Sequence, residues 1–96
     1  MRRPSAGRKR DANEASIVAA LRAAGATVEQ LSGPDIPDLL VGYGKDNYLA
    51  EVKADDGKLE PGQVQWIIGW RGNRVWVLRT PEDGLQMLGL KVRSNG

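Results

Sequence analysis

The stretch 37–53 constrains the fold of this chain more than any other part of the sequence. It contains two apolar segments that are separated by the turn-forming residues 44–47, and this pattern predicts a β-hairpin. Asp38, Glu51 and Lys53 lie in these segments, although a buried strand normally carries no charge. The hairpin therefore has to place three charged side chains where water, hydrogen-bond partners or opposite charges can reach them.

Side chains alternate between the two faces of a strand, so Glu51 and Lys53 share one face and Val52 lies on the other. The predicted turn sets Asp38 roughly opposite Val52, and hence beside Glu51 and Lys53. Two carboxylates and an ammonium group then meet at one end of the sheet. Oxygen ligands in this arrangement suit a hard divalent cation.

The remaining pattern predicts three helices and further strands around the hairpin. The predicted elements are a helix that begins after Asp11 or Asn13 and ends at Gly25, a strand over 26–31, a loop over 32–37, the hairpin strands over 37–43 and 48–53, a helix from Pro61 to Trp70, a strand over 75–78, a helix over 81–88 and an edge strand over 90–92. Thr80 and Pro81 have the residue types of a helix start, and the continuous apolar run 75–78 predicts a strand that is buried on both faces. The order α-β-β-β-α-β-α predicts an α/β fold with a small mixed sheet flanked by helices.

Composition excludes several kinds of chemistry. The chain of 96 residues has no histidine and no cysteine, which excludes Ser-His-Asp and Cys-His catalysis, disulfides and the usual zinc sites. Any reaction has to use carboxylates, lysine, hydroxyl groups or a bound metal. No segment is apolar enough for a membrane span or a secretory signal, so we expect a cytoplasmic location. A chain of this size forms one modest core, and a homodimer would bury more surface.

Basic residues are concentrated at the start of the chain. The net charge is +2, and residues 1–10 hold five of the fourteen basic residues and no acid, whereas 11–96 holds nine basic and twelve acidic residues. We therefore expect a flexible basic arm over 1–10 and a single domain over 11–96. Such an arm attracts nucleic-acid phosphates; the alternative is an unstructured start whose arginines have no role. The candidate nucleic-acid-binding residues are Arg2, Arg3, Arg8, Lys9 and Arg10.

Pro37-Asp38 followed by Glu51-Val52-Lys53 resembles the signature of the PD-(D/E)XK nuclease superfamily. The chain further resembles the small standalone members of the VRR-NUC group, which are often phage-encoded and related to Holliday-junction resolvases. The additional residues that carry this resemblance are Asn13-Glu14, Gly25, the run Leu59-Glu60-Pro61-Gly62-Gln63 and Trp66. The likeness spans roughly 14–78. The arginine and the long insertions of larger members are not evident, which leaves specificity open.

The resemblance implies a restriction-endonuclease-like core and a metal-dependent DNA endonuclease. Its Mg²⁺ or Mn²⁺ would be held by Asp38, Glu51 and the Val52 carbonyl, with Glu14 as a further ligand directly or through water. Lys53 would act electrostatically, and Gln63 would hold the Lys53 amine, the phosphate or a water. The implied substrate is branched DNA such as a Holliday junction, in a bacterial or phage-infected cell. No membrane and no small-molecule cofactor are implied.

Two other functions remain open at this point. The first is a non-catalytic DNA-binding module with the same fold. The second is an interaction protein that uses its Trp-rich helix, because Trp66 and Trp70 favour a core or dimer-interface role over base stacking, as does Trp76. Taken singly, Asp38 fits a turn, Glu51 and Lys53 a solvated ion pair, and Glu14 and Gln63 an exposed helix start. Their combination favours the nuclease.

Overall fold

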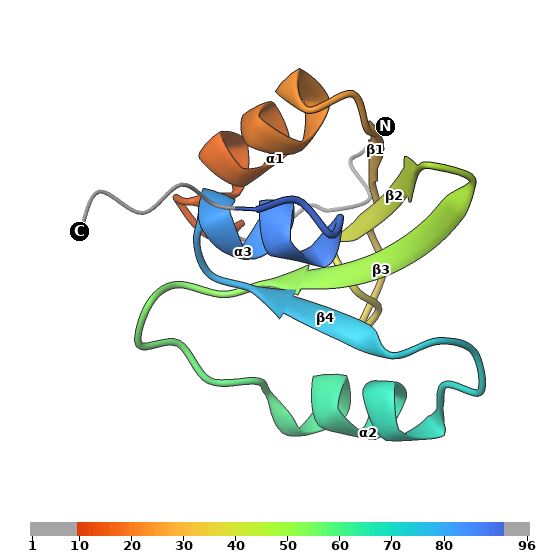
Figure 1. The fold of residues 1–96 in the computed structure, drawn as a ribbon. Helices are drawn as coiled ribbons and strands as arrows, with labels where there is room; N and C mark the ends of the chain where they lie inside the picture. The colour runs from red at the N-terminus through yellow and green to blue at the C-terminus, as the bar shows by residue number, and fades with distance from the viewer. Residues whose placement is uncertain (1–9, 92–96) are drawn as a thin grey trace, which may run out of the picture.

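A computed structural model describes residues 10–91 of the chain. These residues form three helices and four strands in the order predicted from the sequence (Figure 1). The elements are α1 (Glu14–Ala23), β1 (Thr27–Gln30), β2 (Leu39–Tyr43), β3 (Asp46–Val52), α2 (Pro61–Gly69), β4 (Val75–Leu78) and α3 (Pro81–Met87). Within this range no helix has the length and apolar character needed to cross a membrane. The predicted small α/β fold with a mixed sheet is confirmed.

The four strands form one sheet in the order β1-β2-β3-β4. Neighbours among β1, β2 and β3 pair antiparallel, whereas β4 pairs parallel to β3. A parallel pair needs a crossover connection, and the segment that contains α2 provides it. Because β4 lies at the edge of the sheet, three of its four residues are only half-buried. The prediction that this strand is buried on both faces is wrong.

The β2–β3 hairpin has a turn of two residues, Gly44 and Lys45, because Tyr43 pairs with Asp46. The turn residues have φ angles of 59° and 74°, and two left-handed residues in succession form the type I′ turn that matches the twist of the strands. The predicted turn over 44–47 is therefore too long, since its last two residues already belong to β3.

This short turn sets the register of the hairpin. Leu39 pairs with Ala50, so one further step along the ladder places Asp38 opposite Glu51. The predicted position of Asp38, opposite Val52, is wrong by one residue. Residues that lie opposite each other in antiparallel strands project to the same face of the sheet. The two carboxylates are therefore direct cross-strand neighbours.

The hydrophobic core lies between one face of the sheet and the helices α1 and α3 (Figure 1). Ile17 and Leu21 of α1 are fully buried there, as are Leu39 of β2 and Leu78 at the end of β4. The helices approach each other at the buried Gly84 of α3, where an added Cβ would lie 3.1 Å from a methyl carbon of Leu21. The absence of a side chain at this position allows the close contact.

Helix α2 lies on the other side of the sheet (Figure 1), and none of its residues is buried. Its first turn is closed by a hydrogen bond of 2.8 Å from the Glu60 amide to Gln63 Oε1, with Pro61 at the first helical position as predicted. At its other end, Ile68 is 71% exposed and Trp70 is 44% exposed. The helix therefore presents apolar side chains to the solvent.

The chain that follows α3 leaves the helix through Gly89, which has a φ angle of 81°. The next amide, of Leu90, donates to a carbonyl of α3 at 3.0 Å, and the Leu90 side chain packs against the core. This is the Schellman type of helix end. The predicted edge strand over 90–92 is wrong for Leu90 and Lys91, which are not in a strand, and Val92 lies outside the described residues.

Gly84→Val tests the contact between α1 and α3. The added methyl groups would press against the fully buried Leu21, and overpacking of a core costs about 1–3 kcal/mol. We expect the free energy of unfolding, measured with urea, to fall by this amount. Gly69→Ala is the control, because nothing lies within 4 Å of the added Cβ. A Gly84→Val chain as stable as the wild type would contradict the described packing.

Candidate active site

Three charged residues are buried within the described range 10–91, and all three are acids of the predicted site. Glu14, Asp38 and Glu51 have exposed fractions of 3%, 5% and 2%. They come from different elements, since Glu14 begins α1, Asp38 directly precedes β2 and Glu51 lies in β3. A buried carboxylate is costly unless cations or hydrogen-bond donors surround it. The fold therefore has to supply partners at this point.

Asp38 is fixed by hydrogen bonds from the strands on both sides of it. Its backbone carbonyl accepts a hydrogen bond of 2.7 Å from the amide of Leu31, directly after β1. Its side-chain Oδ2 accepts a hydrogen bond of 2.8 Å from the amide of Val52 in β3. The carboxylate is consequently held at the end of the sheet with a defined orientation.

Glu51 is held by residues that follow it in the chain. Gln63 in the first turn of α2 donates from Nε2 to Glu51 Oε2 at 2.6 Å, and Lys53 Nζ lies 4.0 Å from the same oxygen. The Glu60 amide fixes the other end of the Gln63 side chain. Since Val52 belongs to the core on the opposite face, these contacts attach α2 to the sheet on the face of Glu51.

Glu14 has two partners that the sequence did not reveal. Its Oε2 accepts hydrogen bonds of 2.8 Å from Arg10 and of 2.8 Å from Gln30 Nε2, whereas its buried Oε1 has no hydrogen-bond partner among the described residues. The alternation of β1 contains a signal for Gln30, because it shares a face with the buried Val28 and so faces the helices. For Arg10 the sequence pattern contains no such signal.

A polar pocket of about 60 Å³ collects most of these side chains. It is lined by Arg10, Asp11, Asp38, Glu51, Val52, Lys53 and Gln63. Four of the five predicted catalytic side chains are in this set, together with Val52. The exception is Glu14, which is connected to the pocket through Arg10. The Nη1 atom of Arg10 lies 2.8 Å from Glu14 Oε2 and 3.6 Å from Asp38 Oδ1.

Asn13 supports the pocket in a way that differs from the prediction. It occupies the N-cap position of α1, but its side chain makes no capping hydrogen bond. The side-chain amide instead donates to the carbonyl of Lys53 at 3.0 Å and to the carbonyl of Arg79 at 2.7 Å. It thereby joins the start of α1 to the ends of β3 and β4, directly beside the candidate site.

The donor chemistry of the pocket fits a hard divalent cation. Within residues 10–91, no three or more His, Cys, Asp or Glu side chains are grouped as a metal site. Mg²⁺, however, keeps several waters and is bound by only one or two carboxylates in many sites. Asp38 and Glu51 with the Val52 carbonyl would supply such oxygen ligands. About 10–15 Å³ is enough for one water, so the pocket has room for an ion and a few waters.

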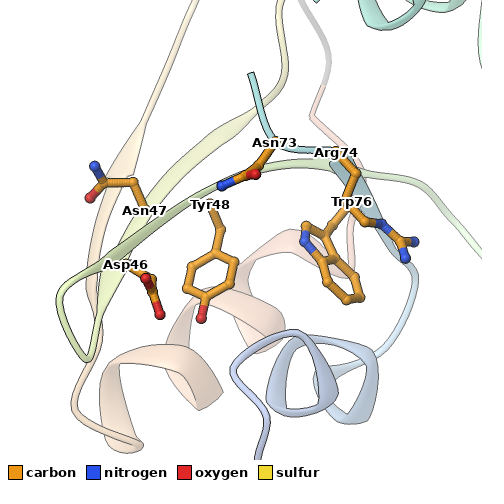
Figure 2. Close-up of a pocket in the computed structure, with 6 residues that line it drawn as sticks. All are labelled: Asp46, Asn47, Tyr48, Asn73, Arg74 and Trp76. Carbon is orange, nitrogen blue, oxygen red and sulfur yellow. The ribbon is translucent and has the colours of Figure 1, made fainter. Parts of the chain in front are cut away.

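Three larger hollows lie elsewhere on the described surface, and none of them is lined by a pair of buried acids. Figure 2 shows one of about 320 Å³, in which the rings of Tyr48 and Trp76 project from neighbouring strands to the same side of the sheet. The Arg74 guanidinium lies 4.0 Å from the centre of the Trp76 ring. The only acid that lines this hollow is the exposed Asp46. This hollow is larger than the candidate pocket but lacks its buried carboxylates.

The three tryptophans have different environments. Trp76 is half-buried and packs against the core. Trp66 and Trp70 stack on each other with ring centres 5.0 Å apart. Trp70 and the partly exposed Leu40 also line a hollow of about 420 Å³. The exposed apolar surface thus lies on α2 and the adjoining face of the sheet.

Of the five arm residues proposed to bind nucleic acid, the structure describes Arg10 alone. Arg10 is partly buried and contacts the candidate site. The other four, Arg2, Arg3, Arg8 and Lys9, lie outside the described residues. Their predicted role stays a prediction.

Comparison of the chain with protein-family models and with curated proteins gives no match. The functional assignment therefore depends on the residues of the pocket and on their geometry.

Proposed function

We propose that this chain is a metal-dependent DNA endonuclease whose active site is the pocket around Asp38 and Glu51. The observation that carries the proposal is that the buried charged residues of the described chain are three acids gathered at one sheet end. An ammonium group lies beside them, at 4.0 Å from Glu51. Replacing buried charged groups with apolar side chains of similar volume is often neutral or stabilising, so stability alone does not account for such a cluster. A non-catalytic DNA-binding module would have no use for it.

Mg²⁺ or Mn²⁺ bound here would supply Lewis-acid chemistry, which neutralises the phosphate and makes an attacking water more acidic. Asp38 and Glu51 would hold the ion, with the Val52 carbonyl as a third oxygen donor. The Lys53 side chain lies beside Glu51 in the pocket, so its role is to stabilise the negative charge that develops when water adds to phosphorus. Gln63 positions Glu51 through its hydrogen bond of 2.6 Å.

Glu14 supports this site from α1. Its buried Oε1 has no hydrogen-bond partner among residues 10–91, so it retains capacity to accept a hydrogen bond from a water. Arg10 links its other oxygen to Asp38. We assign Glu14 the role of a ligand through water, since its side chain does not line the pocket itself.

The finer assignments follow from the resemblance described above. They are a restriction-endonuclease-like core, membership of the VRR-NUC group of PD-(D/E)XK nucleases, and a preference for branched DNA such as a Holliday junction. They also include a phage or bacterial origin and action in the cytoplasm. A homodimer would support them, because two sites related by a two-fold axis can nick two strands symmetrically.

Cleavage of a labelled four-way junction with Mg²⁺ or Mn²⁺ tests the proposal. We expect Asp38→Asn to remove a metal ligand and Lys53→Met to remove transition-state stabilisation. Each change should lower the cleavage rate by about 10²–10³. Linear and flap substrates of the same sequence, measured in parallel, report the preference for branched DNA.

Two exposed positions provide matched controls for these variants. Asp46→Asn and Lys58→Met make the same chemical changes at exposed residues that do not line the pocket, and both should cleave at the wild-type rate. Cleavage that persists in Asp38→Asn and Lys53→Met would place the reaction elsewhere or trace it to a contaminant.

The exposed apolar surface of α2 favours a second role, which is an interface with another copy of the chain. Ile68 and Trp70 are exposed, and Trp70 shares a hollow with Leu40 of β2. Tryptophan is among the residues most enriched at the energetic centres of interfaces. We propose this surface as the contact of the expected homodimer; an interaction protein that lacks nuclease activity would use it in the same way.

Trp70→Glu tests the interface by sedimentation velocity. The wild-type chain should sediment as a dimer, and the buried charge of the variant should weaken dimerisation by at least about tenfold. Gln65→Glu adds the same charge at an exposed position of α2 and is the control. A wild-type chain that sediments as a monomer, or a dimer insensitive to Trp70→Glu, would exclude this surface.

A further inference from the structure

Arg10 contacts two of the three buried acids. Its Nη1 atom lies 2.8 Å from Glu14 Oε2 and 3.6 Å from Asp38 Oδ1. Its Nη2 atom donates a hydrogen bond of 2.6 Å to the carbonyl of Leu31. Although the sequence pattern assigns Arg10 to a solvated arm, the side chain is only 26% exposed and lines the candidate metal pocket.

At this position the Arg10 guanidinium would compete with a bound divalent cation for the Asp38 carboxylate. An ion bound by Asp38 and Glu51 would share the Asp38 carboxylate with the guanidinium, and two positive charges within a few ångströms repel strongly in a partly buried site. Lys53 is the other cation that lines the pocket, and its Nζ lies 4.0 Å from Glu51 Oε2. The guanidinium of Arg10 is paired with Asp38 Oδ1 at 3.6 Å, so an ion bound by Asp38 has to compete with it.

The contacts of Arg10 are unequal in a way that allows displacement. The hydrogen bonds to Glu14 and to the Leu31 carbonyl are short, whereas the ion pair with Asp38 is longer. Arg10 also precedes α1 and belongs to no helix or strand. The guanidinium can give up Asp38 while Glu14 and the Leu31 carbonyl keep it in place, so displacement does not require the core to open.

We propose that Arg10 is an internal counter-ion of the site, which neutralises Asp38 in the metal-free protein and has to leave Asp38 when the metal binds. The inference rests on the proposed metal-dependent function and adds to it a residue that tunes metal affinity. It makes Arg10 a competitor of the metal, whereas the sequence pattern alone makes it a phosphate contact of the arm.

Calorimetric titration of the whole chain with Mn²⁺ tests this inference without any nuclease assay. Arg10→Gln removes the charge but keeps amide hydrogens for Glu14 and the Leu31 carbonyl. We expect its dissociation constant for Mn²⁺ to be about tenfold lower than that of the wild type. Arg10→Lys keeps the charge and should bind Mn²⁺ as weakly as the wild type.

Arg22→Gln is the matched control, because Arg22 lies in the last turn of α1 and donates to the carbonyl of Val28, outside the pocket. It should leave Mn²⁺ affinity unchanged. If Arg10→Gln binds Mn²⁺ with unchanged or weaker affinity than the wild type, Arg10 is a structural contact and the inference is wrong. If neither the wild type nor any variant binds Mn²⁺, the proposed metal-dependent function fails as well. This result differs from the one in which Mn²⁺ binds but Arg10→Gln does not bind it more tightly.

Thermal unfolding with and without Mn²⁺ covers the case in which Arg10→Gln folds poorly, because a ligand that binds only the folded state stabilises it. The counter-ion role predicts that Arg10→Gln is less stable than the wild type without Mn²⁺ and gains more stability from the ion. An equal gain in the two proteins would overturn it.

Discussion

The candidate site depends on one interaction, the hydrogen bond of 2.8 Å from the Val52 amide to the Asp38 carboxylate. It fixes an acid at the point where the chain enters β2, and the hairpin register then sets that acid opposite Glu51. The Leu31 amide holds the backbone of Asp38 from the other side. Without this hydrogen bond and register, Asp38 would lie in a loop with no fixed position relative to Glu51. With them the two carboxylates form a fixed, buried pair at the end of the sheet.

Burial of that pair determines what surrounds it. Buried acids require donors or cations, and each partner here joins a different part of the fold to the site: Gln63 attaches α2, Arg10 attaches the segment before α1, and Lys53 extends β3. The cluster thus connects elements that share few core residues, since α2 has no buried residue of its own. Charged groups retained in the interior at a cost to stability are characteristic of functional sites.

The hairpin and the meeting of its charges followed from the sequence, because turn residues and strand alternation are local signals. The register did not, because Lys45 adopts a left-handed conformation that its residue type does not favour. The place of Arg10 was also missed, since a run of basic residues indicates a solvated arm and carries no information on tertiary contacts. Likewise, Leu90 packs against the core as part of the helix end, a choice that depends on tertiary packing rather than on local β propensity.

Anomalous diffraction from crystals soaked in Mn²⁺ tests the central claim most directly, because it locates the ion without reference to any reaction. We predict one strong peak in the pocket, within about 2.0–2.4 Å of oxygens from both Asp38 and Glu51, and a guanidinium of Arg10 that no longer contacts Asp38. A map with no peak there, or with Asp38 still paired to Arg10 at saturating Mn²⁺, would contradict it.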